Sequence, residues 1–584
     1  MQVHRVWPGA TAGNVALAVV SAAALVAYLV APPQVPDLSA QVARAELVQR
    51  VGLTVWWQGW FGGLHLPTYS ALSPLVMSML TPPLTGVLSA VASAAAMARL
   101  LRSSLRPTAG MAAFLVTDIA NLVNGRITFG IGLALGLWCL ASFRQAPVRS
   151  RAAITGTLAV LTCLASPLAG MFLGLATITI VLADRSQNRH SLHLTLLVAG
   201  SLLATGSLFP GAGLMPFEPI NLLPAFACTI GVGVLCRGTR LRLGAAAYLL
   251  LQLAFLAYPT AVGLNVTRLA WIFAVPLLVA WAGLPRRSLL VVVVAAGLLP
   301  MVDLGRQLDA ASDRSARSAF YRPLVVALAA DQAARPHTLG QRVEVIDTRN
   351  HWASAHVARQ HPLARGWERQ ADRANNPLFY ASGQIDSAGY HAWLTELAVG
   401  WVAVPVARLD YASVHEAELV ATGPPYLRAI WSNEDWTLYR VVNAPPLARP
   451  AAVLEIDDRG LTLAARARTV HLAVRWSPYL VVTHRSGRLV TGCVGRRDGW
   501  TFIRIPTPGT YRVVADFDGQ LRRNQPPCRS DGATVPDSAQ SAPARWDVSP
   551  VSGRHGIQSQ HEGNGVFDAR SAFVSSLLPL ALRR

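Results

Sequence analysis

The sequence predicts a polytopic α-helical membrane protein with about eleven spans, followed by an extracytoplasmic α/β domain and a β-sandwich. Three observations support this fold class. Of the 584 residues, 52% are hydrophobic and only 14% are charged, whereas a soluble domain carries about 25% charged residues. Apolar segments of spanning length fill the first 302 residues and then stop. Of the 31 acidic residues, 26 follow position 302.

The membrane half is predicted from segment length. A transmembrane helix needs about 20 apolar residues, and several of the segments are somewhat shorter. Their limits are 12–31, 82–99, 107–123, 127–143, 152–167, 169–183, 191–208, 220–236, 243–262, 269–283 and 289–303. We expect the first segment to be a signal anchor, because its apolar stretch is longer than that of a signal peptide and further spans follow. Residues 1–303 are therefore predicted to form one transmembrane domain.

The arginines determine the predicted orientation. The chain has no lysine, and if the spans alternate, fourteen of the eighteen arginines before residue 303 fall on one side. Short arginine-rich loops stay in the cytoplasm, so we expect a cytoplasmic N-terminus in the plasma membrane and residues 304–584 outside. The net charge of +20 thus mostly reports topology. Nucleic-acid binding is not expected, since these arginines are scattered over short loops and form no patch.

The few charges that break this pattern are the candidates for function. The outward side of the membrane half carries Asp37, Glu46, Asp118 and Glu218, together with Arg44, Arg50, Arg126 and Arg268. Carboxylates at membrane depth are costly and usually face a cavity or a partner. Ordinary loop charges are the alternative, but the one-sided set favours binding or chemistry at the outer surface.

Residues 32–70, the first outer loop, contain the most informative pattern. After Asp37, apolar residues recur at helical spacing with polar residues opposite, which predicts a short amphipathic helix lying flat on the membrane interface. The side chains that follow at the predicted headgroup level or in the next tight turn are Trp56, Trp57, Trp60, His65 and Tyr69. An aromatic belt would explain the rings, but aromatic faces beside a carboxylate also suit a sugar ring.

A multi-span chain with an acidic residue in a long first outer loop, an interfacial helix there and an outer C-terminal domain resembles the GT-C glycosyltransferase superfamily. Within it, the chain is most similar to YfhO-type proteins and to the actinobacterial mannosyl- and arabinofuranosyltransferases. The segment LYRVVNAPPLARPA, residues 438–451, is similar to the end of a YfhO-type outer domain. The resemblance implies transfer of a sugar from a polyprenyl-phosphate donor to an envelope glycan or lipid acceptor at the outer face.

The outward charges can be given roles on this basis. Glycosyl transfer from a lipid phosphate needs a base for the acceptor hydroxyl and stabilisation of the leaving phosphate. Asp37 matches the family's first-loop carboxylate and is the expected base, with Glu46 or Asp118 as a second acid. Arg126 and Arg268 are expected to bind the donor phosphate. The expected substrate contacts are Trp56, Trp57, Trp60, His65, Tyr69 and Glu218. No metal ligand is assigned, because the loop has no Asp-x-Asp or Glu-x-Asp pair; a divalent cation stays open as a cofactor.

The outer half divides into three parts. Residues 304–445 mix helical and strand patterns and predict an α/β domain, in which residues 365–380 either contact carbohydrate or pack the domain on the membrane half. Residues 446–528 predict a small β-sandwich, with strands at 451–456, 460–465, 468–475, 479–484, 500–505 and 510–517. Cys493 and Cys528, the two cysteines outside the predicted spans, are expected to form a disulfide in an oxidising compartment. Residues 529–584 are expected to be a disordered tail.

Two other classes of function stay open. The chain could be a transporter or flippase for an envelope lipid or sugar, or a non-catalytic envelope-assembly protein. Transporters often show inverted repeats and mid-membrane charges, and the sequence shows no repeat and few such charges. The assembly hypothesis requires the outward carboxylates to be dispensable. The lysine-free composition is compatible with a high-GC bacterium.

Overall fold

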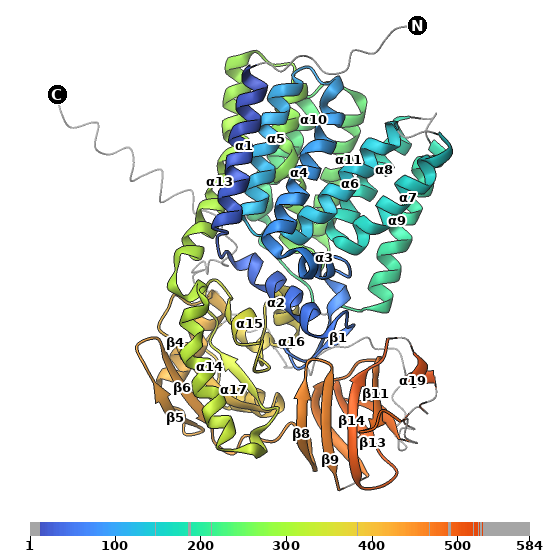
Figure 1. Cartoon of the computed structure of the whole chain (residues 1–584). Coiled ribbons are helices and arrows are strands. Elements are labelled where there is room, and N and C mark those ends of the chain that lie inside the picture. The colour runs from blue at the N-terminus through green and yellow to red at the C-terminus, as the bar shows by residue number, and fades with distance from the viewer. Residues whose placement is uncertain are drawn as a thin grey trace, which may run out of the picture.

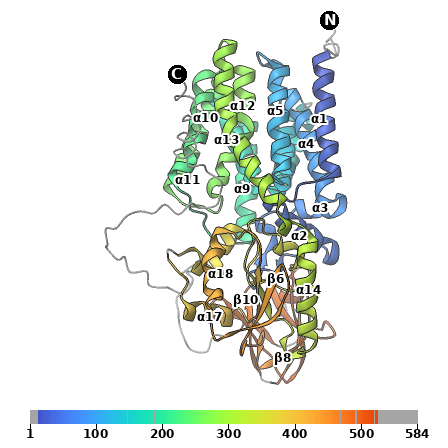
Figure 2. The ribbon, with the colours of Figure 1, turned by 90° about the vertical axis from the view of Figure 1, so that its left-hand side faces the viewer.

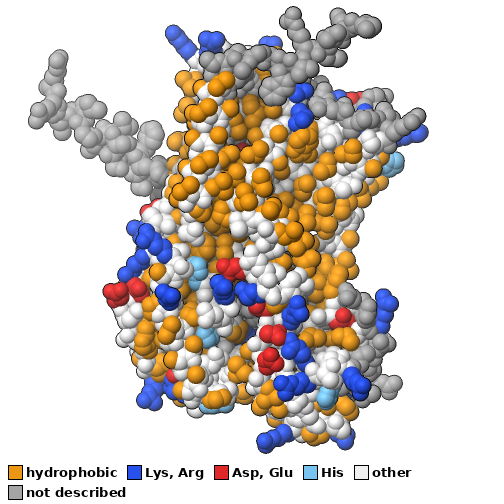
Figure 3. Space-filling view, in the orientation of Figure 1, with side chains coloured by type: hydrophobic (Ala, Val, Ile, Leu, Met, Phe, Trp, Pro, Cys, Tyr) orange, Lys and Arg blue, Asp and Glu red, His pale blue; other side chains and the backbone are white. Residues whose placement is uncertain are grey.

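The computed structural model describes residues 12–528, apart from 146–147, 185–187, 212, 382, 467, 489–491, 518, 524 and 526–527. A bundle of long helices forms one end of the molecule, and two sheet-containing domains, here called the outer domains, form the other (Figure 1). Hydrophobic side chains cover most of the visible bundle, whereas charged side chains gather on the outer domains and at the far end of the helices (Figure 3). The tail predicted at 529–584 lies outside the described residues.

Eleven helices in the described part of the chain correspond to the eleven apolar segments. They are α1 (Ala12–Val30), α4 (Pro82–Leu100), α5 (Pro107–Val123), α6 (Ile127–Gln145), α7 (Val148–Ala165), α8 (Pro167–Ala183), α9 (Asn188–Leu208), α10 (Leu223–Leu235), α11 (Thr239–Ala257), α12 (Arg268–Trp281) and α13 (Arg286–Ser312). Five helical stretches are long and apolar enough to cross a membrane: Pro82–Ser103, Arg189–Leu208, Thr239–Ala257, Gly263–Trp281 and Arg286–Ser312. The chain is therefore a multi-helix membrane protein, while the count of about eleven spans stays a prediction.

Helix α13 joins the bundle to the outer domains. It continues past residue 303, where the last apolar segment ends, and runs towards the outer domains (Figure 2). Near its end the Asp309 carboxylate accepts hydrogen bonds from Arg349 at 2.8 Å and Arg408 at 3.0 Å. Helix α13 is thus part of the bundle and continues without a break to the α/β domain.

The predicted interfacial helix forms, but its surroundings differ from the prediction. Ten residues of helix α2 (Pro36–Val51) are buried, including Gln41 and Arg44 on the side predicted to be solvated. The short helix α15 (Ala353–His356) packs on it, and the Trp352 indole donates a hydrogen bond to the Gln34 carbonyl at 2.8 Å. The helix is therefore enclosed between the bundle and the α/β domain. Its apolar and its polar side therefore both contact protein.

The α/β domain is built on one four-stranded sheet in the order β3-β4-β6-β5. The strands are β3 (Arg342–Val345), β4 (Val399–Pro405), β5 (Leu427–Ser432) and β6 (Trp436–Val441). β3 and β4 pair in parallel and the other neighbours are antiparallel. The accompanying helices are α14 (Ser318–Ala333), α15, α16 (Arg369–Asn375), α17 (Ser387–Glu396) and α18 (Val414–Ala421). The mixed helix and strand pattern of the sequence therefore gives the expected α/β architecture.

The second outer domain is a sandwich of two four-stranded sheets, β12-β13-β10-β7 and β11-β14-β9-β8. Its strands are β7 (Ala448–Arg449), β8 (Ala451–Asp457), β9 (Gly460–Ala465), β10 (Thr469–Arg475), β11 (Leu480–His484), β12 (Cys493–Arg497), β13 (Trp500–Arg504) and β14 (Gly509–Ala515). Six of them match predicted strands. β7 is too short to show a pattern, and β12 contains Gly495 and two arginines in place of apolar alternation.

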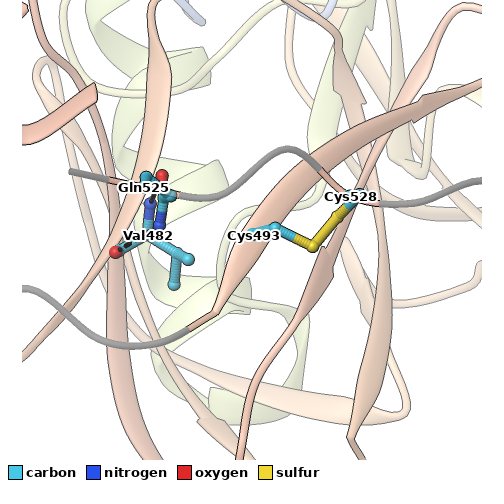
Figure 4. The surroundings of a disulfide bond; sticks show 4 residues. All are labelled: Val482, Cys493, Gln525 and Cys528. Atoms are coloured by element: carbon cyan, nitrogen blue, oxygen red, sulfur yellow. Dashed lines mark hydrogen bonds between the residues drawn. A yellow bond between two sulfur atoms is a disulfide. The ribbon is translucent and has the colours of Figure 1, made fainter. Parts of the chain in front are cut away.

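The predicted disulfide between Cys493 and Cys528 is present (Figure 4). It attaches the end of the described chain to β12. Close by, the Gln525 side chain makes two hydrogen bonds with the backbone of Val482, at 3.2 and 2.9 Å. The segment after β14 is thus held against the sandwich by one covalent link and one paired set of hydrogen bonds.

Candidate functional site

A cluster of charged side chains lies where the first outer loop meets the bundle. The Asp37 carboxylate, in the first turn of α2, lies 3.4 Å from Arg126 Nε and 3.4 Å from Arg268 Nη2. The Asp37 side chain is 34% exposed, so it is accessible to a substrate. Three of the residues predicted for the site are therefore brought together from positions up to 231 residues apart.

The turn between α5 and α6 positions Arg126. Gly125 has a φ of +69° and touches α2 so closely that an added Cβ would lie 2.6 Å from Val35 and 3.0 Å from Leu38. Glycine is needed here for both reasons. The Gln41 side chain fixes the contact, donating to the Gly125 carbonyl and accepting from the Thr128 amide at 2.7 Å. Gln41, expected on a solvated face of α2, thus aligns α2 with Arg126.

Asp303 completes the cluster and was not among the predicted site residues. Its carboxylate lies 3.2 Å from Arg126 Nη2, so Arg126 bridges Asp303 and Asp37. Burial by itself would lower the pKa of Arg126, but the charges of Asp303 and Asp37 together raise it. The signal in the sequence was an acidic residue at the outer end of the last apolar segment, directly after Pro300-Met301-Val302.

Tyr69 and Arg44 link this cluster to the α/β domain. The buried Arg44 guanidinium lies 4.5 Å from the Tyr69 ring centroid and 5.2 Å from that of Trp60, and it pairs with Glu368. Burial raises the pKa of Tyr69, which the charge of Arg268 partly offsets, so its hydroxyl is neutral and able to donate. Burial lowers the pKa of Arg44 to about 10, which still leaves it charged at neutral pH. Tyr69 is therefore the predicted substrate contact that the structure places at the site.

An apolar cavity of about 600 Å³ lies inside the bundle beside the cluster. Its lining begins in the first turns of α6 and α12, at Phe129 and Leu269, and ends at Arg151, Asp184 and Arg240 at the far end of the helices. Arg268 lies next to this lining, with its guanidinium 5.8 Å from the Phe129 ring centroid. Such a volume lies within the range of about 300–1,000 Å³ found for ligand sites. Its lining is mostly hydrophobic, so it suits a hydrocarbon chain.

The tryptophans of the first outer loop, which the sequence predicts as substrate contacts, are buried against the outer domains. Trp56, Trp57 and Trp60 are at most 2% exposed. Trp57 donates to the Asp458 carboxylate at 2.9 Å, Trp60 donates to the Ser354 carbonyl at 3.1 Å, and Trp56 belongs to the sandwich core. Buried indoles normally find a hydrogen-bond partner, and here the partners belong to both outer domains. The outer domains therefore cover these three rings.

Four other predicted residues lie away from the cluster. Glu46 is nine residues beyond Asp37 in α2, about 14 Å along the helix, and faces Arg50. Asp118 is buried in α5; its neighbours Thr117 and Asn121 line a narrow crevice beside Arg126, but Asp118 does not. His65 contacts the Ser477 hydroxyl and the Pro210 carbonyl at the edge of the sandwich. Glu218 is exposed at the start of a short 3-10 helix, Pro219–Leu222.

Residues 365–380 pack the α/β domain rather than present a free surface. Arg365 forms paired hydrogen bonds with Asp372, and Arg369 forms paired hydrogen bonds with Asp410. An added Cβ on Gly366 would lie 2.4 Å from the Trp60 ring, so this segment lies directly on the first outer loop. Of the two alternatives for this segment, the structure therefore favours packing on the membrane half.

The cluster does not fit a divalent cation in this arrangement. Its two carboxylates, Asp37 and Asp303, are bridged by the Arg126 guanidinium, which occupies the position between them. Within the described ranges, no three His, Cys, Asp or Glu side chains are grouped as metal ligands. Arg126 and Arg268 are the cations that contact Asp37.

Comparisons with known proteins give two similar solved structures. No protein-family model and no curated protein matches the chain. A cryo-EM structure of the arabinofuranosyltransferase AftD from Mycobacteria is 17% identical with a TM-score of 0.45, covering 77% of this chain and 41% of that chain. A mutant of AftD gives 16% identity and a TM-score of 0.42, covering 79% and 43%. The chain thus spans about two fifths of the length of AftD.

Proposed function

We propose that the protein is a membrane glycosyltransferase that moves a sugar from a polyprenyl-phosphate donor to an envelope glycan or lipid acceptor at the outer face of the plasma membrane. One observation carries this proposal. The accessible Asp37 carboxylate lies 3.4 Å from each of two guanidiniums. One of them, Arg268, lies over the ring of Phe129, which lines one end of an apolar cavity in the bundle. A base, two phosphate ligands and a hydrocarbon site are the groups that transfer from a lipid phosphate requires.

The residues divide the chemistry as follows. Asp37 accepts the proton of the acceptor hydroxyl, whose oxygen forms the new bond to the anomeric carbon of the sugar. The bond between that carbon and the donor phosphate oxygen breaks, and polyprenyl phosphate leaves with the electron pair. Arg126 and Arg268 bind the phosphate as its charge grows. Asp303 holds Arg126 in place, and the neutral Tyr69 hydroxyl donates to the donor.

Donor binding changes the pairing within the cluster. Before it binds, the Asp37 carboxylate accepts hydrogen bonds from both guanidiniums. A donor phosphate competes for the same guanidiniums and frees the carboxylate for the acceptor hydroxyl.

The hydrocarbon chain of the donor occupies the apolar cavity. The cavity meets the cluster at Phe129 and Leu269, so a lipid with its phosphate on Arg268 can extend its first isoprene units between α6 and α12. In this orientation the N-terminus of the chain is cytoplasmic and the outer domains are extracytoplasmic, as the arginine distribution also predicts. The outer domains then face the acceptor.

Purified protein in lipid nanodiscs, supplied with a set of polyprenyl-phosphate sugars and glycan acceptors, tests the proposal. We expect transfer with at least one donor and its loss in Arg268→Ala. A bulky residue in the cavity, Ala176→Trp, should raise the donor KM. The matched control Leu250→Trp changes a residue that is 67% exposed on α11 and outside the cavity lining, so it should leave KM unchanged. Absence of transfer with every donor would overturn the proposal.

Movement of a lipid carrier is the second candidate function, because the cavity reaches Arg151 and Arg240 at the far end of the helices. A flippase would bring fluorescent polyprenyl phosphate across a proteoliposome membrane without forming a glycosidic product. Transfer to an acceptor without carrier movement excludes this candidate.

A further inference from the structure

A second hollow, a groove of about 610 Å³, lies at the end of the bundle away from the outer domains, where α5 and α13 begin and α12 ends. It is bounded by residues 106–109 at the start of α5, by Val279 of α12 and by one face of the first turns of α13, and we call it the far groove. It shares no lining residue with the apolar cavity inside the bundle. Its volume lies in the range of about 300–1,000 Å³ that ligand sites have.

One stripe of α13 forms a wall of the far groove. Its members, three and four residues apart and therefore on one face of the helix, are Arg286, Leu289, Leu290 and Val293. The arginine stands in the first turn, and the apolar side chains extend about 10 Å along the helix axis from it. Leu290 is 64% exposed, so the groove is open at the side of the bundle. A cation followed by an apolar strip matches the order of groups in a phospholipid, a phosphate followed by a hydrocarbon chain.

The opposite wall of the far groove is held firmly. Gly110 of α5 packs so closely on α12 that an added Cβ would lie 2.7 Å from the Ala280 Cβ. The Arg106 guanidinium donates to three carbonyls at and after the end of α12, at 2.9, 3.1 and 3.3 Å. The groove therefore exists between a fixed pair of helices, α5 and α12, and the stripe of α13.

The charge at the far groove is positive. The carbonyls that accept from Arg106 satisfy its hydrogen bonds but, being neutral, do not cancel its charge. Arg286 adds a second guanidinium, which is exposed. Among the described residues, the acidic side chain at this end of the bundle is Asp184, which pairs with Arg240 at 2.6 Å and lies outside the groove. Because α5 and α13 both begin here, the positive ends of two helix dipoles add to the charge of the arginines. An anion with an apolar tail is therefore the complement of this groove.

We propose that the far groove binds an anionic phospholipid of the adjacent leaflet, with its phosphate at Arg286 and one acyl chain along the apolar stripe of α13. Basic pockets between membrane helices bind such headgroups, and a guanidinium is a strong ligand for phosphate oxygens. Arg106 contributes its charge, since its donors are already used. A zwitterionic lipid carries an ammonium that offsets its phosphate, and a soluble phosphate makes no use of the apolar stripe. The proposal goes beyond the transfer reaction, and its test measures binding only, so either can fail without the other.

The test uses the purified full chain in detergent micelles, with thermal unfolding and native mass spectrometry as readouts. The probes are dioleoyl phosphatidylglycerol, dioleoyl phosphatidylcholine with the same chains, and glycerol phosphate as the headgroup alone. A ligand of the native state raises the unfolding midpoint in proportion to its occupancy. We expect phosphatidylglycerol to raise the midpoint and to stay bound, phosphatidylcholine to need a concentration about fivefold higher or more, and glycerol phosphate to have no effect. Equal effects of the two lipids, no effect of phosphatidylglycerol, or the same effect from glycerol phosphate would overturn the proposal.

Neighbouring residues of α13 provide matched controls for the far groove. Arg286→Gln removes the charge inside it, whereas Arg287→Gln removes the same charge one residue later, outside the lining. We expect Arg286→Gln to weaken the binding of phosphatidylglycerol about fivefold and Arg287→Gln to leave it nearly unchanged. Leu290→Trp fills the groove and should weaken binding severalfold, whereas Val291→Trp, at a residue that is 69% exposed and outside the lining, should not. Equal losses within each pair would show a general attraction to the bundle and overturn the assignment of the groove.

Discussion

Replacing Asp37 by asparagine tests the proposed chemistry most directly. The substitution keeps the size of the side chain but removes its charge and its capacity to accept a proton. Because the Asp37 side chain is 34% exposed and Arg126 retains its contact with Asp303, we expect the variant to fold. The effect should therefore fall on catalysis rather than on stability, which thermal unfolding of the purified variant would verify.

The size of the effect follows from the role. A positioned general base contributes about 10²–10⁴-fold to the rate, which corresponds to about 3–5 kcal/mol of transition-state stabilisation. Asp37→Asn should lower kcat by this factor. The donor KM should stay constant or fall, because Arg126 Nε and Arg268 Nη2, each 3.4 Å from Asp37, are then freed for the phosphate.

Asp303→Asn is the matched control. It removes a second carboxylate from the same cluster, but one that contacts only Arg126 among the cluster's guanidiniums. We expect a rise in donor KM of up to about fivefold, since a partly exposed ion pair contributes at most about 1 kcal/mol, with a small change in kcat. Initial rates over a matrix of donor and acceptor concentrations separate the two variants. Near-normal kcat in Asp37→Asn, or an equal loss of kcat in both variants, would refute the role of Asp37 as the base.

Three further predictions concern the phosphate ligand, a buried carboxyl group and metal dependence. Arg268→Lys keeps the charge but loses the planar fork, so the donor KM should rise about tenfold; an unchanged KM would remove Arg268 from the phosphate site. Burial raises the pKa of Glu344, whose oxygens have no hydrogen-bond partner in the described chain. A carboxyl group with a raised folded-state pKa loses stability as the pH rises above its unfolded value. Glu344→Gln should therefore stabilise the outer domains at pH 7 by about 1–3 kcal/mol, a gain that vanishes near pH 4 in thermal unfolding; a gain independent of pH would contradict this. Treatment with EDTA should leave transfer intact, because Arg126 occupies the position between the two carboxylates; a loss restored by Mg²⁺ would show that a cation is required.

Local patterns were sufficient for elements that depend on neighbouring residues. The apolar segments correspond to helices, and the alternating strands from 451 onwards correspond to a sandwich, because these periodicities arise from burial of one face or of a whole span. Asp37, Arg126 and Arg268 were identified because they lie in predicted outward loops, where the membrane half of the chain has few charged residues. That signal reports the cost of placing a charge at the outer end of an apolar helix, and it needs no tertiary information.

The structure differs from the sequence-based expectations mainly at covered surfaces. An amphipathic or aromatic pattern looks the same in the sequence whether lipid or another protein domain covers it. A row of tryptophans after an amphipathic helix is typical of a membrane interface, yet Trp57 and Trp60 donate to Asp458 and Ser354 of the outer domains. Asp118 looked equivalent to Asp37 as an acidic residue in an outward position. Helix rotation decides which of them reaches the cluster, and a shift of one residue turns a side chain by about 100°.

By itself, the sequence determined the membrane class of the chain, the division into a bundle and outer domains, the disulfide and the three central charges of the site. Only the tertiary structure decided that Asp303 joins Arg126, that Arg44 and Glu368 connect the site to the α/β domain, and that Arg268 lies over Phe129 at the lining of a cavity. The physical reason is the separation along the chain between the residues that interact. Hydrophobic periodicity is a local property, whereas ion pairs between residues more than 150 positions apart depend on how whole helices pack, which no local pattern encodes.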